Sequence, residues 1–405
     1  MTTYNDKIRQ FVLDSVKETR VTGKPHPFWN SLKNTGTELW LDTGDIQEAE
    51  LNWSSEMSAL TTNNTLLNNE IQKGIYDEFI AGVSTLVNDL PEEKRVQEIA
   101  FILNALHGLR LVTRFGGSVS VELHTDTAHD IEAIVDYGKR FHAICPDGFV
   151  VKVPYTPSGF IGARKLRDAG VRINFTLEFS ARQNVLVTMM ARPDYLNIFL
   201  NRVDVYLTLN KLGEGTGAGD NAVLSSQKWV TKLSKNNPLP TKLIVASLLN
   251  YKQLELLAGA DVFTIPTYVA AEGIAKLSGN FRSRLNENYP VNLYDTAKDA
   301  SIEKFYEVDD KVLNFGTQLA SKLPQSGEEF VERAHKAGCG DMFPLLSDQE
   351  LSILDKDGKI PIHSKWEEKI KSGVLAPDTL LTLAGLAVFT NSQNELDNRI
   401  KGIIS

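Results

Sequence analysis

The chain has 405 residues, of which 42% are hydrophobic and 23% are charged, a composition typical of folded globular proteins. This composition excludes a disordered or fibrous chain. The 43 Lys and Arg against 51 Asp and Glu give a formal charge of −8, and no basic run could follow a nucleic-acid backbone. We therefore expect no nucleic-acid partner.

The amino-terminal sequence MTTYNDKIRQF lacks the basic region and apolar run of a signal peptide, and no apolar stretch is long enough to cross a membrane. The segment NDKIRQFVLDSVKETR has the spacing of a helix. Cys145 and Cys339 are the two cysteines, so we expect reduced core thiols rather than a disulfide framework. These features predict a cytoplasmic protein with no membrane partner.

Short apolar runs rich in β-branched and aromatic residues recur along the chain, and each is followed by a segment with helical spacing. Eight such units favour a closed (β/α)8 barrel, the TIM barrel class, over an open doubly wound sheet, which gives the same alternation. The predicted strands are ELWLDTG from Glu38, SALTTN from Ser58, VSVELH from Val119, FVVKVPY from Phe149, RINFTLEF from Arg172, YLNIFLNRV from Tyr195, TKLIVASL from Thr241 and DVFTIP from Asp261.

Three regions follow from this pattern. We expect a helical amino-terminal segment at residues 1–37, a barrel catalytic domain at 38–276 and a long, mostly helical carboxy-terminal extension at 277–405. Within the extension, HKAGCGDMFPLLSDQELSILDKDGKIP is rich in Gly, Pro and Asp and is predicted to be loop. PDTLLTLAGLAVFTNSQNELDNRIKGI is predicted to be a helix.

One lysine lies within an apolar predicted strand, FVVKVPYT. Barrel strands are covered on both faces, so Lys152 is expected to project into a largely dehydrated interior, which disfavours the charged form of an amine. A neutral amine can add to a ketone and form an iminium that accepts electrons during carbon–carbon cleavage. A plain ion pair with Glu122, or a lysine that reaches solvent at a strand end, is the structural alternative.

Polar residues gather at the carboxyl ends of the neighbouring predicted strands, where barrel enzymes place their chemistry. Residues two apart in a strand share a face, as Asn174 and Thr176 do. This pattern favours an active site, although a satisfied internal hydrogen-bond network is the alternative. The set consists of Asp42, Asn63, Glu122, Asn174 and Thr176.

These segments resemble the transaldolases, and the resemblance covers about Glu38 to Lys276 in order. LWLDTGD places Asp42 at the acid/base aspartate, and VSVELH places Glu122 at the glutamate that works through a water. VVKVPYTPSG places Lys152 at the Schiff-base lysine. NFTLEFS is similar to the family's NLTLLFS, which puts Thr176 at the threonine that positions the water.

The same resemblance implies the substrate-binding residues. SALTTNNTLL is similar to the family's TTNPS signature and places Asn63 at the donor-binding asparagine, and NFTLEFS places Asn174 at a substrate-binding asparagine. FLNRV is similar to FVGRI, so Phe199 matches a pocket aromatic and Arg202 the arginine that receives the substrate phosphate. VASLLNYKQLELLAGAD places Ser247 in register with the seventh strand.

Four positions depart from the family pattern. Asn64 replaces the signature proline, Asn197 a serine that contacts phosphate, Leu249 a second phosphate-binding arginine, and His124 an acidic residue. We hypothesise that Lys252 substitutes for the missing arginine. Because the phosphate pocket is altered, the sequence leaves the donor and acceptor sugars open.

The resemblance implies a reaction with no metal and no cofactor, in which a ketose phosphate condenses with Lys152 and a dihydroxyacetone unit passes to an aldose phosphate, as in the pentose phosphate pathway. Close relatives of the family instead use free dihydroxyacetone to make fructose 6-phosphate, and they carry a glutamine where Glu122 stands. Glu122 and Phe199 therefore favour group transfer. A sugar-phosphate-binding barrel without activity is a third reading, and since dimers are common in the family, a homodimer is an expectation.

Two further patterns invite other functions. LGEGTGAGDNA from Leu212 has closely spaced glycines, but Glu214 and Asp220 would repel a pyrophosphate, so we interpret it as a flexible loop after the sixth strand. HTDTAHD from His124 matches no standard metal-ligand spacing. We expect Asp126 or Thr127 to cap a helix instead.

Overall fold

The computed structural model describes residues 4–405, and its eight parallel strands close into a barrel in the order β1 to β8. Each predicted apolar run contains one of these strands, so the predicted barrel is confirmed and the open sheet is excluded. The strands are β1 (Glu38–Asp42), β2 (Met57–Thr61), β3 (Ser118–Glu122), β4 (Phe149–Pro154), β5 (Ile173–Thr176), β6 (Tyr195–Phe199), β7 (Lys242–Ala246) and β8 (Val262–Pro266).

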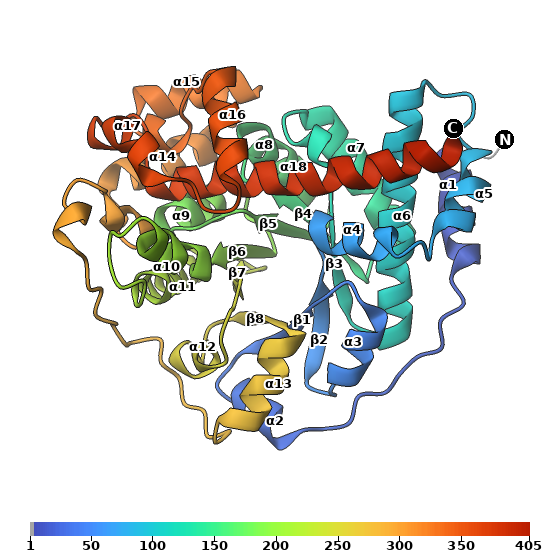
Figure 1. Cartoon of the computed structure of the whole chain (residues 1–405), viewed down its shortest axis with the longest axis horizontal. Coiled ribbons are helices and arrows are strands. Elements are labelled where there is room, and N and C mark those ends of the chain that lie inside the picture. The colour runs from blue at the N-terminus through green and yellow to red at the C-terminus, as the bar shows by residue number, and fades with distance from the viewer. Residues whose placement is uncertain (1–3) are drawn as a thin grey trace.

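Helices precede the barrel and connect its strands, as Figure 1 shows. The predicted amino-terminal helix is present as α1. The helices up to the end of the barrel are α1 (Tyr4–Ser15), α2 (Pro27–Lys33), α3 (Ile46–Asn52), α4 (Asn64–Gln72), α5 (Asp77–Ser84), α6 (Glu92–Phe115), the 3-10 turn η1 (Thr125–Thr127), α7 (Ile131–Ile144), α8 (Pro157–Asp168), α9 (Ala181–Met190), α10 (Leu200–Leu209), α11 (Ala218–Ser234), α12 (Lys252–Leu256) and α13 (Thr267–Lys276).

The residues after α13 form a mostly helical extension, as predicted. Its elements are the 3-10 turns η2 (Asp295–Ala297), η3 (Ile302–Phe305), η4 (Gly340–Met342) and η5 (His363–Lys365), and the helices α14 (Asp310–Ser321), α15 (Gly327–Lys336), α16 (Asp348–Asp357), α17 (Glu367–Lys371) and α18 (Pro377–Ile404).

One prediction for the extension is wrong. The segment expected to be loop contains α16, which begins at a capping box in which Ser347 and Glu350 satisfy each other's backbone N–H groups. Gly358, one of the glycines that suggested a loop, is the residue at which this helix ends. The predicted helix from Pro377 is confirmed as α18, with proline in its first turn.

An apolar cluster lies inside the barrel beside the polar strand ends. It consists of Trp40, Ala59, Ile244, Ala246 and Val262, from β1, β2, β7 and β8. Asp42 lies two residues beyond Trp40 on the same strand face, and Thr61 lies two residues beyond Ala59. Polar side chains therefore take over from the apolar cluster at the carboxyl ends of β1 and β2.

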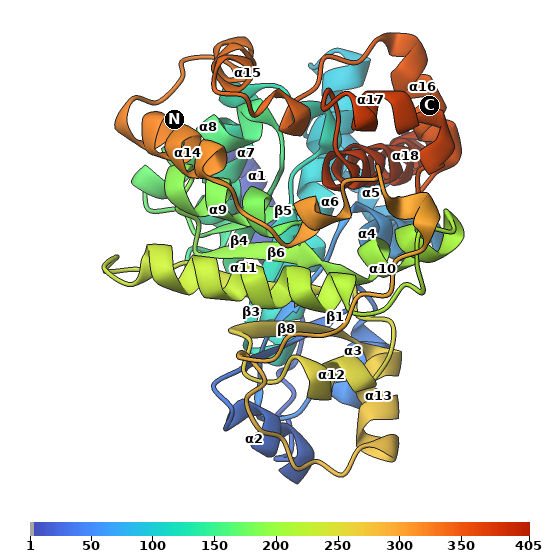
Figure 2. The ribbon, with the colours of Figure 1, turned by 90° about the vertical axis from the view of Figure 1, so that its left-hand side faces the viewer.

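The last helix, α18, crosses the carboxyl end of the barrel. Figure 1 shows it in red, running from the other helices of the extension to α5 beside the carboxy-terminus, and Figure 2 shows the same helix nearly end-on. It packs on α4, α5 and α6 of the barrel and on α16 of the extension. Leu354, Trp366, Ile370, Leu375 and Leu380 form a separate apolar cluster that joins α16, α17 and α18.

Several element boundaries differ from the predictions. The sixth strand ends at Phe199, so Arg202 lies in the first turn of α10 rather than on a strand. Cys145 and Cys339 are both free thiols, Cys145 half-buried and Cys339 buried. Among residues 4–405, no helix combines the length and hydrophobicity that a membrane crossing requires.

Candidate active site

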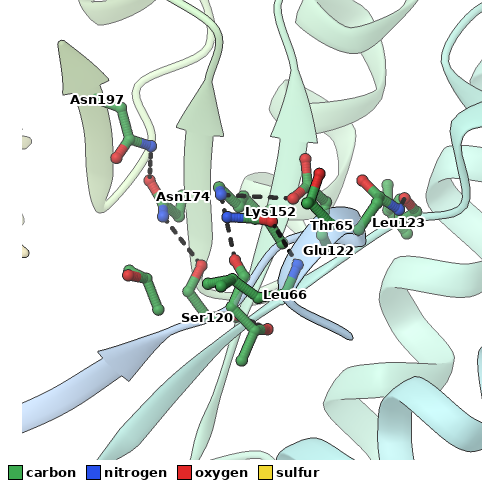
Figure 3. Close-up of polar contacts among 12 residues, drawn as sticks. Thr65, Leu66, Ser120, Glu122, Leu123, Lys152, Asn174 and Asn197 are labelled. Atoms are coloured by element: carbon green, nitrogen blue, oxygen red, sulfur yellow. Dashed lines mark hydrogen bonds and ion pairs between the residues drawn. The ribbon is translucent and has the colours of Figure 1, made fainter. Parts of the chain in front are cut away.

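Lys152 lies inside the barrel on β4, with 4% of its surface exposed. Glu122 on β3 and Asn174 on β5 are its register partners, so the three side chains form one inward row across adjacent strands. The Nζ atom donates to the Glu122 carboxylate at 3.4 Å and to the Thr62 carbonyl at 3.2 Å (Figure 3). The structure thus brings together the predicted lysine and glutamate.

Two carboxyl groups interact with Lys152: that of Glu122, which is buried, and that of Asp42, which is partly buried. Burial raises the pKa of Glu122, and the nearby Lys152 partly opposes this shift. Burial also raises the pKa of Asp42, while a 2.7 Å hydrogen bond from the Thr61 hydroxyl and the Lys152 charge work against it. A carboxyl group with a raised pKa holds its proton more readily, which suits it to exchange protons with a substrate or a water during turnover.

A cavity of about 150 Å³ opens onto Lys152. It contains five of the predicted site residues besides Lys152, so the carboxyl-end location of the site is as expected. Asn63 accepts from the Leu66 N–H as the cap of α4, so its amide NH2 group is the part that can face a ligand. The lining residues are Asp42, Thr61, Asn63, Lys152, Asn197, Phe199, Arg202, Ala246, Ser247, Thr264 and Phe389.

Three of the predicted residues do not line this cavity. Asn174 is fully buried, donates to Ser120 and accepts from Asn197, as Figure 3 shows, so it lies behind Asn197 and fixes that residue's amide. Thr176 is also fully buried, and its hydroxyl makes no hydrogen bond with another described residue. Glu122, the third, reaches the site through its contact with Lys152.

The backbone is strained at two strand ends next to the cavity. Ser247 follows β7 with φ of 65°, and Leu177 follows β5 with φ of 79°, both in the left-handed region that non-glycine residues rarely adopt. Such strain persists only where the surrounding structure enforces it and is frequent at functional sites. Of the two residues, Ser247 lines the cavity.

Arg202 supplies positive charge at the cavity wall. Burial lowers the pKa of its guanidinium to about 10, and one terminal nitrogen is buried without a hydrogen-bond partner in the described chain. Its guanidinium carbon lies 5.9 Å and 6.0 Å from the ring centres of Phe179 and Phe199. No carboxylate of residues 4–405 forms an ion pair with it, so its charge is available to an anionic ligand.

The structure adds site residues that the sequence did not indicate. Glu178 is fully buried, and burial raises its pKa well above the usual range, while backbone N–H groups, its own first, and the charge of Lys152 oppose the shift. A signal existed, because Glu178 stands where the family pattern NLTLLFS has leucine. Phe389 comes from α18, and no motif indicated it.

Two of the four departures contact α18. Asn64 donates to Gln393 at 2.9 Å, and His124 lies 3.1 Å from the carboxylate of Asp397. The other two do not: Asn197 lines the cavity, and Leu249 is 52% exposed. Lys252 is exposed and lies outside the cavity lining, so its hypothesised role in phosphate binding gains no support.

The two patterns interpreted as incidental have defined structures. Asp130, rather than Asp126 or Thr127, caps the helix α7, so that prediction is wrong. His124 accepts from the Asp126 N–H through Nδ1, which leaves Nε2 to donate to Asp397, so both ring nitrogens have partners. The glycine-rich segment follows α10 rather than β6, and from Ala218 onward it is the first turn of α11.

Comparison with known proteins gives consistent relatives. A probable transaldolase of Thermus thermophilus is 32% identical over 232 residues, which are 56% of this chain and 86% of that protein. A probable transaldolase of Chlorobium phaeobacteroides is 29% identical over 232 residues, with the same shares of the two chains. A transaldolase of Xanthomonas euvesicatoria is 27% identical over 215 residues, 51% of this chain and 66% of that protein.

The family model for transaldolase/fructose-6-phosphate aldolase matches residues 39–319. This range takes in the barrel and ends within α14, so α18 lies beyond it. The resemblance drawn from the strand-end residues is thereby confirmed. With most of its length matched and the Lys152–Glu122 pair at the barrel mouth, the chain is an enzyme of the transaldolase/fructose-6-phosphate aldolase family.

Proposed function

We propose that the protein is a transaldolase that moves a dihydroxyacetone unit from a ketose phosphate, such as fructose 6-phosphate or sedoheptulose 7-phosphate, to an aldose phosphate in the pentose phosphate pathway. The observation that carries the proposal is Lys152, an amine buried in β4 within 3.4 Å of a carboxyl group and open to a cavity. A desolvated amine beside a proton donor suits carbinolamine formation and its dehydration to an iminium.

In this proposal, the two carboxyl groups have separate tasks. Asp42, at the cavity wall, takes the proton of the C4 hydroxyl as the C3–C4 bond breaks, and the electron pair enters the Lys152 iminium to form an enamine. Glu122 and the free hydroxyl of Thr176 handle the proton of a water molecule while the carbinolamine forms and breaks down. General acid–base catalysis of this kind contributes roughly 10² to 10⁴ in rate.

The binding groups of the donor follow from the cavity lining. Asn63 and Asn197 present amides to the donor hydroxyls, and Asn174 acts by holding Asn197. Phe199 forms an apolar wall, and Ser247 offers a hydroxyl from the strained end of β7. Arg202 is positioned to receive the phosphate.

We expect Arg202→Ala to reduce kcat/KM for fructose 6-phosphate while leaving unphosphorylated fructose nearly unchanged. Charged hydrogen bonds contribute about 1.5–3 kcal/mol, so the loss should be roughly 10- to 100-fold. Steady-state kinetics with both sugars checks this, with exposed Lys252→Ala as the control variant. Equal losses of kcat/KM for the two sugars would show that Arg202 maintains the fold and does not bind the phosphate.

The experiment that tests the proposed function compares turnover of fructose 6-phosphate with and without an acceptor such as erythrose 4-phosphate. Transfer predicts consumption that depends on the acceptor. Efficient release of free dihydroxyacetone without an acceptor would instead support the fructose-6-phosphate aldolase activity that the family name also includes. No turnover of any ketose phosphate would favour a binding protein.

A further inference from the structure

One face of α18 meets the catalytic end of the barrel at regular intervals. Phe389, Gln393 and Asp397 are four residues apart, which places them on one side of the helix. All three are at least nine-tenths buried, with 4%, 3% and 8% of their surfaces exposed. This face therefore packs on the barrel and is not a solvent surface.

The two polar residues of this face form a continuous hydrogen-bond network with the ends of β2 and β3. Asn64 donates to the Gln393 side-chain oxygen at 2.9 Å, and the Gln393 amide donates to Asp397 at 2.9 Å. His124 completes the network at Asp397. Asn64 directly follows the predicted donor-binding residue, and His124 is two residues beyond Glu122, so α18 is tied to the segments that carry the site.

The third residue of the face reaches the reacting nitrogen. Phe389 lines the cavity, and its ring centre lies 5.8 Å from Lys152 Nζ. This part of the cavity wall comes from α18, which lies beyond the range that the family model matches. A ring at this distance leaves less room for water beside the group that Lys152 would carry.

We propose that Phe389 is a specificity-determining residue that decides whether the dihydroxyacetone unit on Lys152 is transferred to an aldose or released to water. The inference rests on the proposed function. Gln393 and Asp397 are positioning residues, because they hold the ring over Lys152 through Asn64 and His124.

Transfer and release differ in what the enamine reacts with. In transfer, its nucleophilic carbon attacks the acceptor aldehyde, a carbon–carbon bond forms, and the aldehyde oxygen takes a proton from Asp42. Water then adds to the product iminium, and the bond to Lys152 Nζ breaks to give the product ketose and the free amine. In release, the same carbon takes a proton from water, a further water adds to the iminium carbon, and the bond to Lys152 Nζ breaks to give dihydroxyacetone and the free amine. No oxidation or reduction occurs in either branch. Both branches use a water to hydrolyse the iminium, but only release needs a proton from water at the nucleophilic carbon, so keeping water away from that carbon favours transfer.

The test measures the ratio of free dihydroxyacetone to transferred product, from fructose 6-phosphate and a fixed acceptor concentration. We expect Phe389→Ala to raise this ratio by about tenfold, and Phe389→Leu, which keeps most of the apolar bulk, to change it by less than about threefold. Phe389→Val should give a product ratio between those of the other two variants, and it replaces Phe389→Ala in the test if the alanine variant does not fold. Leu386→Ala is the matched control, because Leu386 lies on the same helix but lines a separate cavity of about 640 Å³.

The proposed function and this inference fail in different ways. A wild-type protein that neither forms a borohydride-trapped adduct nor transfers carbon would contradict the proposed function itself. A wild-type protein that does both, with unchanged product ratios in the folded Phe389→Ala and Phe389→Val variants, would overturn only the role of Phe389. If Leu386→Ala raises the ratio of free dihydroxyacetone to transferred product as much as Phe389→Ala does, the role of Phe389 is also overturned, because the change would reflect general loosening of α18.

Discussion

Replacing Lys152 with methionine is expected to abolish turnover of ketose phosphates, by at least about 10⁴-fold in kcat, the scale on which losing a covalent nucleophile acts. Methionine has a similar length and no amine, and the site is already buried, so the fold should persist. Burial raises the pKa of Glu122 and the charge of Lys152 opposes this shift, so the substitution should raise that pKa further.

The measurement is reduction with borohydride in the presence of fructose 6-phosphate, followed by intact mass spectrometry. The wild-type protein should gain a reduced dihydroxyacetone adduct, and the Lys152→Met variant should gain none. Lys165→Met, an exposed lysine on α8, is the control and should behave as wild type. An adduct that persists in Lys152→Met would assign the Schiff base to another lysine, and no adduct in the wild type would rule out the mechanism.

Replacing Asp378 with alanine is expected to lower the free energy of unfolding by about 3 kcal/mol, because it leaves a buried guanidinium without its main partner. Arg182 donates to both oxygens of Asp378, at 2.8 Å and 2.7 Å, and to Asp341 at 2.6 Å. Asp378 is fully buried and Arg182 is 3% exposed. Asp341 can retain part of the interaction, which limits the loss.

Chemical denaturation of the wild-type protein and the Asp378→Ala variant checks this prediction. The denaturant concentrations at the unfolding midpoints are compared, provided that the dependence of the unfolding free energy on denaturant is the same for both. Asp299→Ala is the control, because its ion pair with Lys371 is exposed and should contribute nothing measurable. Because Asp378 lies in the first turn of α18, we also expect greater protease sensitivity in the extension of the variant. Similar midpoints for Asp378→Ala and Asp299→Ala would contradict the assigned role of the buried pair.

The barrel and the pairing of Lys152 with Glu122 could be predicted because they depend on patterns within short stretches of sequence. Apolar runs of strand length define the barrel, and polar residues at strand ends must converge at one mouth when the strands are parallel. The mistakes were also local: Arg202 was placed on a strand because its apolar neighbours continue past Phe199, where the chain turns into α10.

What the sequence could not predict depends on contacts across the chain. Asn64 and His124 were recognised as departures from the family pattern, but their partners Gln393 and Asp397 are 329 and 273 residues away. Phe389 belongs to a helix whose periodicity shows only that several of its sides are apolar. Which side faces Lys152 is decided by packing on α4, α6 and α16.

The position of α18 also has a consequence for biosynthesis. The ribosome makes this helix after every strand of the barrel has been translated, and amino-terminal regions generally fold first. A nascent barrel therefore has Lys152 and both carboxyl groups in place while Phe389 is still absent. Only a chain translated through the end of α18 encloses the amine, so a product truncated by premature termination would carry a nucleophile open to cellular carbonyl compounds.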